Sequence, residues 1–280
     1  LAKYPKNIFQ IFLQPLYTRM VVEQQSGLDV PGELDVRIKV LFCGVCHSDL
    51  TVAARRSPLS VHYPLVPGHE AVGVCVQLGA AVTKIKIGDH VGIGPLVDSC
   101  LQCHSCISGE EQQCAKQVPT YNGYDWSGRA ATGGHVPYTV GGYSTSMVVH
   151  ERFCILIPPG YPLEHAGPVM CAGTTMYNPM KKAGVQPGTR LGIIGLGGLG
   201  MMGIQLGKAL GCEVTAFSRS KSKRALAMRA GADIFIASNN AAQMAAHAGG
   251  LDLLINTIPA AHDPSLFTPL LAPHGVHIFT

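Results

Sequence analysis

The residues in this sequence that are best suited to metal chemistry are four cysteines in one polar loop. Cys100, Cys103, Cys106 and Cys114 are separated by two, two and seven residues. Thiolates at such spacings are typical ligands of a tetrahedral zinc ion, which can order a loop that has little apolar core of its own. An iron–sulfur cluster is the main rival, but its motif places the fourth cysteine sooner. The pattern therefore predicts a structural zinc site.

A second group of metal-ligand residues is spread over three short segments. Cys46 lies in Cys46-His47-Ser48-Asp49, His69 lies in Gly68-His69-Glu70, and Cys171 begins Cys171-Ala172-Gly173-Thr174-Thr175. Two cysteines and a histidine are suitable protein ligands for a catalytic zinc whose fourth position stays open. A single cysteine is more often a small core residue. We adopt this structural interpretation for Cys43, Cys75, Cys154 and Cys212.

A glycine motif, Gly195-Leu196-Gly197-Gly198-Leu199-Gly200, follows an apolar stretch and precedes a helical pattern. In this setting the first glycine permits a tight turn, Gly197 lets the backbone approach a pyrophosphate, and Gly200 permits close packing of helix and strand. The start of the helix then presents free N–H groups to the anion. The motif predicts dinucleotide binding.

The end of the following predicted strand carries no carboxylate, although NAD-binding proteins place an acid about 20 residues after the glycines. Hydroxyls and cations stand there instead: Ser218, Arg219, Ser220 and Lys223. Such groups suit a 2′-phosphate, so we predict NADP(H). The alternative is a solvated basic turn at the start of a surface helix.

Two kinds of fold must position these residues. Residues 34–40 alternate apolar and polar side chains, with Leu34, Val36, Ile38 and Val40 on one side, which predicts a half-buried antiparallel strand. Further strands are expected at 71–78, 90–93, 146–150 and 154–157. After residue 188, strands alternate with helices, which predicts a parallel sheet with crossover helices on both faces. We expect these strands at 191–194, 213–217, 234–236, 251–255 and 276–279, and the helices at 201–210, 221–230, 241–247 and 264–271.

Composition narrows the class of protein. The chain has 280 residues, 47% of them hydrophobic, which is enough for one large or two ordinary domains. A net charge of +4 argues against nucleic-acid binding. Ten cysteines in a chain with long apolar segments fit a reducing compartment better than a disulfide scaffold. Because no apolar run could span a membrane and no secretion signal is visible, we predict a cytoplasmic protein with no membrane partner.

In their order and spacing, these segments resemble the zinc-containing medium-chain dehydrogenases, and among them the cinnamyl alcohol dehydrogenases. The resemblance implies an α/β chain with a GroES-like, mainly β catalytic domain at residues 1–170. A Rossmann NADP-binding domain with a doubly wound parallel sheet follows at residues 171–280. The resemblance further implies an active site in the cleft between the two domains. It also implies that the protein forms a homodimer. Because the family's chain returns to the catalytic domain, it also implies a C-terminally incomplete fragment that stops at about the fifth strand. The segments that carry the resemblance are 43–50, 67–70, 100–114, 141–144, 171–175 and 195–200.

The resemblance assigns roles to the metal-site residues. It implies that Cys46, His69 and Cys171 hold the catalytic zinc. Glu70 is expected beside the zinc, as an adjacent carboxylate or occasional ligand. Asp49 is expected to orient His69.

The resemblance also implies a proton relay and cofactor contacts. Ser48 is expected to carry the substrate proton toward solvent, and His47 and Thr175 to contact the cofactor together with the glycine motif. The family often has a histidine at the position of Thr51. Threonine has no pKa near neutrality, so the relay must shorten, use water or work poorly. Trp126 lies in a loop at residues 124–140 that departs from the family pattern and is a candidate wall of the substrate pocket.

The leading hypothesis is an oxidoreductase with two zinc ions per chain. It would transfer a hydride between NADP(H) and primary alcohols or aldehydes, including aromatic, cinnamyl-type ones. The alternative is a truncated or diverged relative without catalysis that keeps the structural zinc and nucleotide binding. Thr51, the poorly matched N-terminus and the missing C-terminal segment motivate that alternative.

Overall fold

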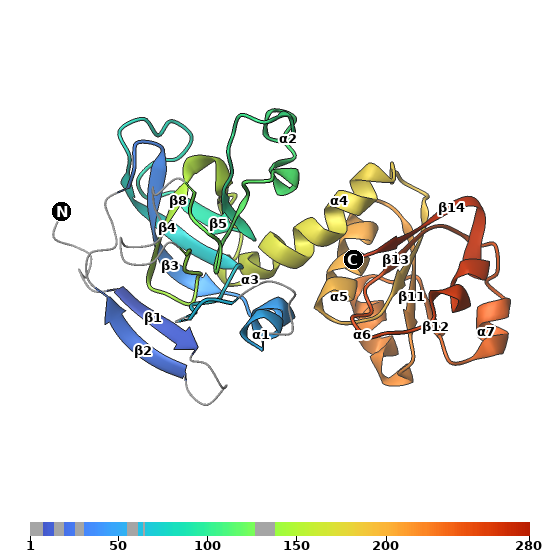
Figure 1. Cartoon of the computed structure of the whole chain (residues 1–280). Coiled ribbons are helices and arrows are strands. Elements are labelled where there is room, and N and C mark those ends of the chain that lie inside the picture. The colour runs from blue at the N-terminus through green and yellow to red at the C-terminus, as the bar shows by residue number, and fades with distance from the viewer. Residues whose placement is uncertain (1–7, 14–19, 26–30, 55–60, 64, 127–137) are drawn as a thin grey trace. The chain divides into compact units, whose positions relative to one another are not determined.

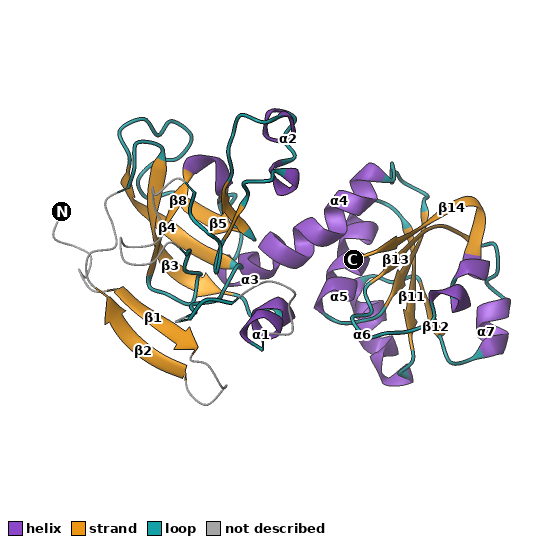
Figure 2. Ribbon diagram, in the orientation of Figure 1, coloured by secondary structure: helices purple, strands orange, loops and turns teal. Residues whose placement is uncertain are grey.

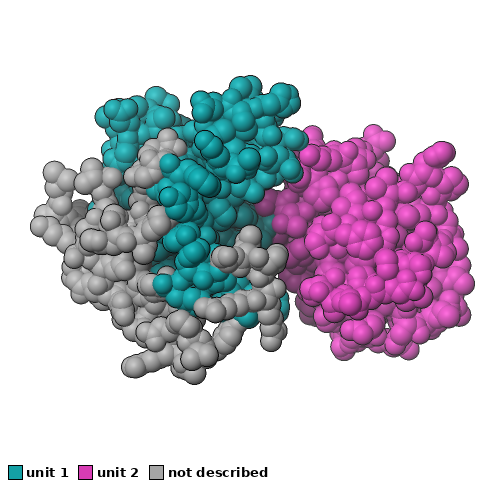
Figure 3. All heavy atoms as spheres, viewed as in Figure 1, with its two compact units in different colours: residues 1–171 teal, residues 172–280 magenta. Residues whose placement is uncertain are grey.

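A computed structural model describes residues 8–13, 20–25, 31–54, 61–63, 65–126 and 138–280 of the chain. The chain forms two compact units, Leu1–Cys171 and Ala172–Thr280 (Figure 3). The predicted domain boundary lies one residue earlier. A search of the described residues finds no helix with the length and apolarity to cross a membrane.

The first unit is built on a five-stranded antiparallel sheet with the strand order β8-β3-β4-β5-β9 (Figure 1). All five strands were predicted, with small differences at their ends. Valines and isoleucines of the sheet form the core of the unit, among them Val36, Ile38, Val91 and Ile93. The strands are β3 (Asp35–Cys43), β4 (Ala71–Leu78), β5 (His90–Ile93), β8 (Ser146–His150) and β9 (Cys154–Leu156).

The predicted alternation along β3 is wrong at its first residues. Leu34 is 36% exposed, whereas Asp35 is buried. Oδ2 of Asp35 accepts a hydrogen bond from the N–H of Gly32 (3.1 Å), so a local turn supplies a donor to the carboxylate that the pattern had placed in solvent.

Short elements that the sequence did not predict surround this sheet. Two antiparallel pairs are β1 (Ile8–Leu13) with β2 (Met20–Gln25), and β6 (Leu96–Asp98) with β7 (Val118–Pro119). The helices are α1 (His47–Ala53), α2 (His104–Ile107) and α3 (Leu163–Pro168), with 3₁₀ turns η1 (Glu111–Gln113) and η2 (Glu151–Phe153). A π turn, η3 (Val169–Gly173), follows α3 directly.

The second unit is a parallel five-stranded sheet with the order β12-β11-β10-β13-β14 (Figure 1). The five predicted strands are confirmed. Only β14 begins well before its predicted start, because Pro273 and Gly275 interrupt the pattern that marks a strand. The strands are β10 (Arg190–Ile194), β11 (Glu213–Ser218), β12 (Ile234–Ala237), β13 (Leu251–Asn256) and β14 (Leu271–Phe279).

Two apolar layers cover the two faces of this sheet. One joins the strands to α4 (Thr174–Lys182), α5 (Gly198–Ala209) and α6 (Arg224–Ala230), and it includes Met176, Ile204 and Ala227. The other includes Phe217, Leu254 and Phe267 and lies on the face of α7 (Ala241–Ala245) (Figure 2). Helix α4 was not predicted, since Pro179 interrupts its pattern.

The prediction of a helix at residues 264–271 is wrong. The structure has two 3₁₀ turns there, η5 (Pro264–Leu266) and η6 (Thr268–Leu270). Pro269 has no N–H to donate in the middle of this segment and its ring crowds the preceding turn, which disfavours a continuous α-helix here. The predicted helix 221–230 likewise starts with a 3₁₀ turn, η4 (Lys221–Lys223), before α6.

Candidate metal centres and nucleotide site

The four cysteines of the loop converge. Their sulfur atoms all lie within 4.8 Å of one another. The Sγ distances are 3.5 Å for Cys103 and Cys106, 3.5 Å for Cys114 and Cys100, and 3.9 Å for Cys100 and Cys106. Four sulfurs about 2.3 Å from a central zinc stand about 3.8 Å apart in a tetrahedron. The residues therefore fit a structural zinc ion.

The backbone of the loop favours thiolates. The N–H of Cys103 points at the sulfur of Cys100 (3.4 Å), and the N–H of Lys116 points at the sulfur of Cys114 (3.3 Å). Backbone hydrogen bonds from Gln102 and Cys103 lower the pKa of Cys100 to about 6. Deprotonated sulfur is the form that binds a metal.

Arg152 ties this loop to the sheet of the first unit. Its guanidinium donates to the carbonyl oxygen of Cys106 (2.9 Å) and to the Glu111 carboxylate (2.5 Å). One acceptor belongs to the third cysteine, in α2, and the other to η1, between the third and fourth cysteines. Arg152 itself lies in η2, next to β8.

A second cluster consists of Cys46, His69, Glu70 and Cys171, each with one ligand atom within 4.8 Å of the others. The sulfur of Cys171 lies 3.8 Å from the sulfur of Cys46 and 3.2 Å from Nε2 of His69. All four residues belong to the first unit. Two sulfurs, an imidazole nitrogen and a nearby carboxylate form a donor set that suits zinc.

The sheet explains why distant residues meet in this cluster. Strands β3 and β4 are antiparallel, and Cys43 at the end of β3 pairs with Ala71 at the start of β4. Cys46 follows β3, at the N-cap of α1, and His69 precedes β4. Both residues therefore lie at the same end of this strand pair. Cys171 comes from the π turn after α3, a widened turn often found at functional sites.

The charges of this cluster are coupled. Hydrogen bonds with Cys171 and His69 lower the pKa of Cys46 to about 3. Burial lowers the pKa of His69, but the hydrogen bonds and negative charges of Asp49 and Cys46 together outweigh this effect and raise the pKa to about 9. Burial raises the pKa of Glu70. The pocket therefore stabilises a Cys46 thiolate.

Gly44 makes room for the carboxylate. A Cβ at this position would lie 2.0 Å from Oε2 of Glu70, and the Gly44 N–H donates to the Glu70 carbonyl oxygen (3.0 Å). A side chain at position 44 would thus clash with Glu70, which explains why a glycine stands between Cys43 and Cys46.

Asp49 lies within hydrogen-bond distance of His69, the residue that it was expected to orient. Its Oδ1 lies 3.1 Å from Nδ1 of His69, and the carboxylate also accepts the N–H groups of Cys46 and Gly68, each at 3.1 Å. Burial raises the pKa of Asp49, but the hydrogen bond and charge of His69, together with other hydrogen bonds to the carboxylate, outweigh burial and lower the pKa overall. Because the carboxylate accepts from Nδ1, the neutral imidazole of His69 carries its lone pair on Nε2, the nitrogen that could bind a metal.

The residues expected in the proton relay lie on α1. Ser48 is exposed, and its Oγ is 3.6 Å from the sulfur of Cys46. The Thr51 hydroxyl donates to the carbonyl oxygen of His47 (3.1 Å), so its proton is used within the helix. His47 is exposed at the start of the same helix.

Trp126 is 61% exposed and forms an edge contact with Tyr124, with ring centroids 4.8 Å apart. Residues 127–137 of the loop proposed as a pocket wall lie outside the described residues.

In the second unit, the glycine motif has the geometry expected of a dinucleotide loop. Gly195 has φ +88°, and a Cβ at Gly200 would lie 1.9 Å from the Gly195 carbonyl oxygen. A Cβ at Gly197 or Gly198 would meet nothing within 4 Å. The first and last glycines therefore close the turn, while the middle of the loop and the N-terminus of α5 stay open to a ligand.

The basic turn after β11 is joined to this loop. The ammonium of Lys223 donates to the Leu196 carbonyl oxygen (2.8 Å). Ser218 ends β11, Arg219 and Ser220 are exposed, and no acid occurs among residues 218–224. Thr175 lies half-buried in the first turn of α4, in the same unit.

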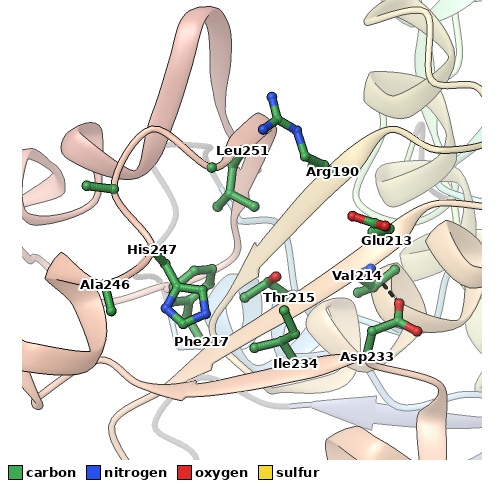
Figure 4. A pocket seen from close by; sticks show the side chains of 12 residues that line it. Arg190, Glu213, Val214, Thr215, Phe217, Asp233, Ile234, Ala246, His247 and Leu251 are labelled. Carbon is green, nitrogen blue, oxygen red and sulfur yellow. Dashed lines mark hydrogen bonds between the residues drawn. The ribbon is translucent and has the colours of Figure 1, made fainter.

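A pocket of about 400 Å³ lies elsewhere in this unit (Figure 4). Its walls include Arg190, Glu213, Ile234 and Leu251, which are the first residues of their strands. Ligands of parallel sheets bind at the opposite, carboxyl ends, where the glycine motif stands. This pocket therefore lies at the opposite end of the strands from the predicted nucleotide site.

Comparison with known proteins agrees with this arrangement. Residues 32–159 match the family model of the alcohol dehydrogenase GroES-like domain, and residues 198–279 match that of the zinc-binding dehydrogenases. A cinnamyl alcohol dehydrogenase structure from Sorghum bicolor is 42% identical, with a TM-score of 0.89 over 98% of this chain and 76% of that one. The chain belongs to the zinc-binding alcohol dehydrogenase family.

Two further relatives place the chain within this alcohol dehydrogenase family. A probable cinnamyl alcohol dehydrogenase 2 from Picea abies is 43% identical over 246 residues. The match covers 87% of this chain but 66% of that relative, so the chain spans just under two thirds of the relative's length. The structure of CAD from Helicobacter pylori complexed with NADP(H) is 34% identical, with a TM-score of 0.84 over 98% of this chain and 75% of that one.

Tyr143 also contacts Asp49, the neighbour of His69 in this metal centre, although the sequence had suggested no role for the tyrosine. The Tyr143 hydroxyl donates to Oδ2 of Asp49 (2.9 Å). Its segment, 141–144, carried the resemblance to these alcohol dehydrogenases but suggested no role. A tyrosine that follows two glycines was the available signal, because paired glycines mark a close approach of two backbones.

Proposed function

We propose that this chain carries the zinc and cofactor sites of an alcohol dehydrogenase or aldehyde reductase. The reaction would move a hydride between NADP(H) and primary alcohols or aldehydes, including aromatic ones. The observation that carries this proposal is the convergence of Cys46, His69 and Cys171 with Glu70 beside them. The names of the cinnamyl alcohol dehydrogenase relatives support the aromatic substrates.

In this proposal Cys46, His69 and Cys171 hold a catalytic zinc, and the four-cysteine loop holds a structural one. A zinc ion bound by Cys46, His69 and Cys171 would polarise the substrate oxygen. The protein's own contribution is orientation: Asp49 fixes the tautomer and direction of His69, and burial of His69 and Cys171 limits the access of water to these two ligands. Ser48, exposed and next to Cys46, would pass the substrate proton toward solvent. Thr51 does not extend this relay by donating a proton, because its hydroxyl donates to the helix backbone.

For the cofactor, the glycine motif would hold the pyrophosphate, and Ser218, Arg219, Ser220 and Lys223 would bind the 2′-phosphate of NADP(H). The open space over Gly197 and Gly198 and the basic turn beside them support this assignment. The nicotinamide would supply the hydride chemistry, while the chain supplies position and charge.

The test uses the purified 280-residue chain. We expect two zinc ions per chain, oxidation of NADPH with cinnamaldehyde, and slower oxidation of NADH. Cys46→Ala should lose one zinc ion and the activity. The matched variant Cys212→Ala, in the core of the second unit, should keep two zinc ions and the activity. One zinc in the wild-type chain together with nucleotide binding but no turnover would favour the non-catalytic alternative.

A further inference from the structure

The segment Gly141-Gly142-Tyr143-Ser144 has no part in the proposed chemistry, yet it lies against the loop that carries His69. Three successive N–H groups of this segment donate to backbone carbonyls of that loop. The pairs are Gly141 to Val66 (2.8 Å), Gly142 to Gly68 (2.7 Å) and Tyr143 to Pro67 (3.1 Å). The two stretches are therefore fixed to each other immediately before His69.

At three glycines, Gly68, Gly141 and Gly142, the contact is too close for a side chain. A Cβ at Gly141 would lie 2.4 Å from the Pro67 carbonyl oxygen, and one at Gly142 would lie 2.7 Å from the Cβ of Ala71. Gly68 has φ +103°, and a Cβ there would lie 2.8 Å from the Tyr143 nitrogen. Glycines on both sides thus determine where the Tyr143 side chain begins.

The Tyr143 ring ends at the carboxylate that holds His69. Its hydroxyl donates to Oδ2 of Asp49 (2.9 Å), while Oδ1 lies 3.1 Å from Nδ1 of His69. Asp49 is 3% exposed, so its charge depends on donors from the protein rather than from water. Burial raises the pKa of Tyr143 well above its usual range, which keeps the hydroxyl protonated as a donor.

We propose that Tyr143 is a positioning residue for the metal centre: its hydrogen bond to Asp49 fixes the direction of His69 and thereby sets how tightly zinc is held. Without the hydroxyl, Oδ2 keeps the Cys46 N–H, and the buried carboxylate gains freedom to rotate away from Nδ1. Hydrogen-bond partners of metal-binding histidines typically change metal affinity by about 10- to 100-fold. The inference rests on the proposed function, because it requires zinc at Cys46, His69 and Cys171.

The experiment measures zinc affinity rather than turnover. The full chain is loaded with zinc, and each site's affinity is determined by competition with a chelator, with the four-cysteine site as internal reference. We expect Tyr143→Phe to weaken one of the two zinc sites about 10-fold or more and to leave the other unchanged. The matched variant Tyr63→Phe, which loses the hydrogen bond to the Ala53 carbonyl oxygen (3.0 Å), should behave as wild type.

Cobalt(II) in place of zinc gives a spectroscopic readout of the same site. We expect Tyr143→Phe to shift the visible absorption bands of the cobalt in the Cys46 site, because the ligand geometry changes. Wild-type affinity and spectrum in Tyr143→Phe would overturn the inference. Equal weakening of both zinc sites, or the same loss in Tyr63→Phe, would also overturn it, since a general loss of structure would then be responsible.

Wild type and Cys46→Ala separate this inference from the proposed function. If wild type holds one zinc and Cys46→Ala holds the same, the catalytic metal site itself is wrong and the inference falls with it. If Cys46→Ala loses one of two zinc ions while Tyr143→Phe keeps both at full affinity, only the role of Tyr143 is refuted.

Discussion

The Lys223 ammonium donates a hydrogen bond to the main-chain carbonyl of Leu196 at 2.8 Å. This contact fastens the basic turn after β11 to the middle of the glycine motif. The groups proposed to bind the pyrophosphate and the 2′-phosphate are thereby held by one side chain.

The first prediction concerns the choice of cofactor. Arg219→Ala should weaken NADPH binding by about tenfold or more, because a hydrogen bond to a charged group contributes about 1.5–3 kcal/mol. NADH binding should change little. The measurement is the Kd of each nucleotide by fluorescence titration, with Arg229→Ala, an exposed arginine at the end of α6, as control. Equal losses for both nucleotides would refute a 2′-phosphate contact.

A second prediction compares two glycines of the same motif. Gly200→Ala should lower the free energy of unfolding by about 1–3 kcal/mol, since its Cβ must displace the Gly195 carbonyl oxygen. Gly198→Ala, which meets open space, should leave the stability unchanged or raise it. Urea unfolding without nucleotide distinguishes the two. The steric explanation is wrong if both variants are equally stable.

A third prediction concerns the four-cysteine loop. Cys103→Ala removes one sulfur of the cluster and should abolish zinc binding there, since structural zinc sites need four ligands. The loop should then become sensitive to proteolysis between residues 100 and 114, while the second unit stays folded. Mass spectrometry of the fragments and metal analysis test this outcome. Cys75→Ala, in the core of the same unit, serves as control and should keep both zinc ions.

The fourth prediction tests the arginine behind that loop. Arg152→Ala removes the donors to the Cys106 carbonyl oxygen and to Glu111, so structural zinc should be released to a chelator several-fold faster. Arg190→Ala breaks a similar half-exposed ion pair with Asp252 in the second unit and should not change the release rate. Identical rates of zinc release in Arg152→Ala and wild type would show that the four-cysteine loop keeps its zinc without Arg152.

The metal centres show how far local sequence can predict a site. All ligands of the four-cysteine loop lie within fifteen residues, so their spacing alone indicated a cluster, and the structure brings the sulfurs together. The glycine motif could also be predicted from the sequence, because Gly195 and Gly200, which close the turn, contact each other and lie close together in the sequence. The strands of both sheets also followed from periodicity, while proline-containing segments such as 264–271 were misassigned.

The sequence by itself determined the local chemistry of this protein: the four-cysteine loop, the glycine motif and the absence of an acid at residues 218–224. The resemblance to known dehydrogenases had grouped Cys171 with His69, but only the tertiary structure brings the two side chains together across 102 residues. In the same structure Cys43, much nearer to His69 in sequence, packs against Gly68 and Gly142. It also decided that Tyr143 holds Asp49. The physical reason is that spacing constrains only residues on one loop or helix, whereas distant partners meet through the register of β3 against β4 and through backbone contacts that glycines allow.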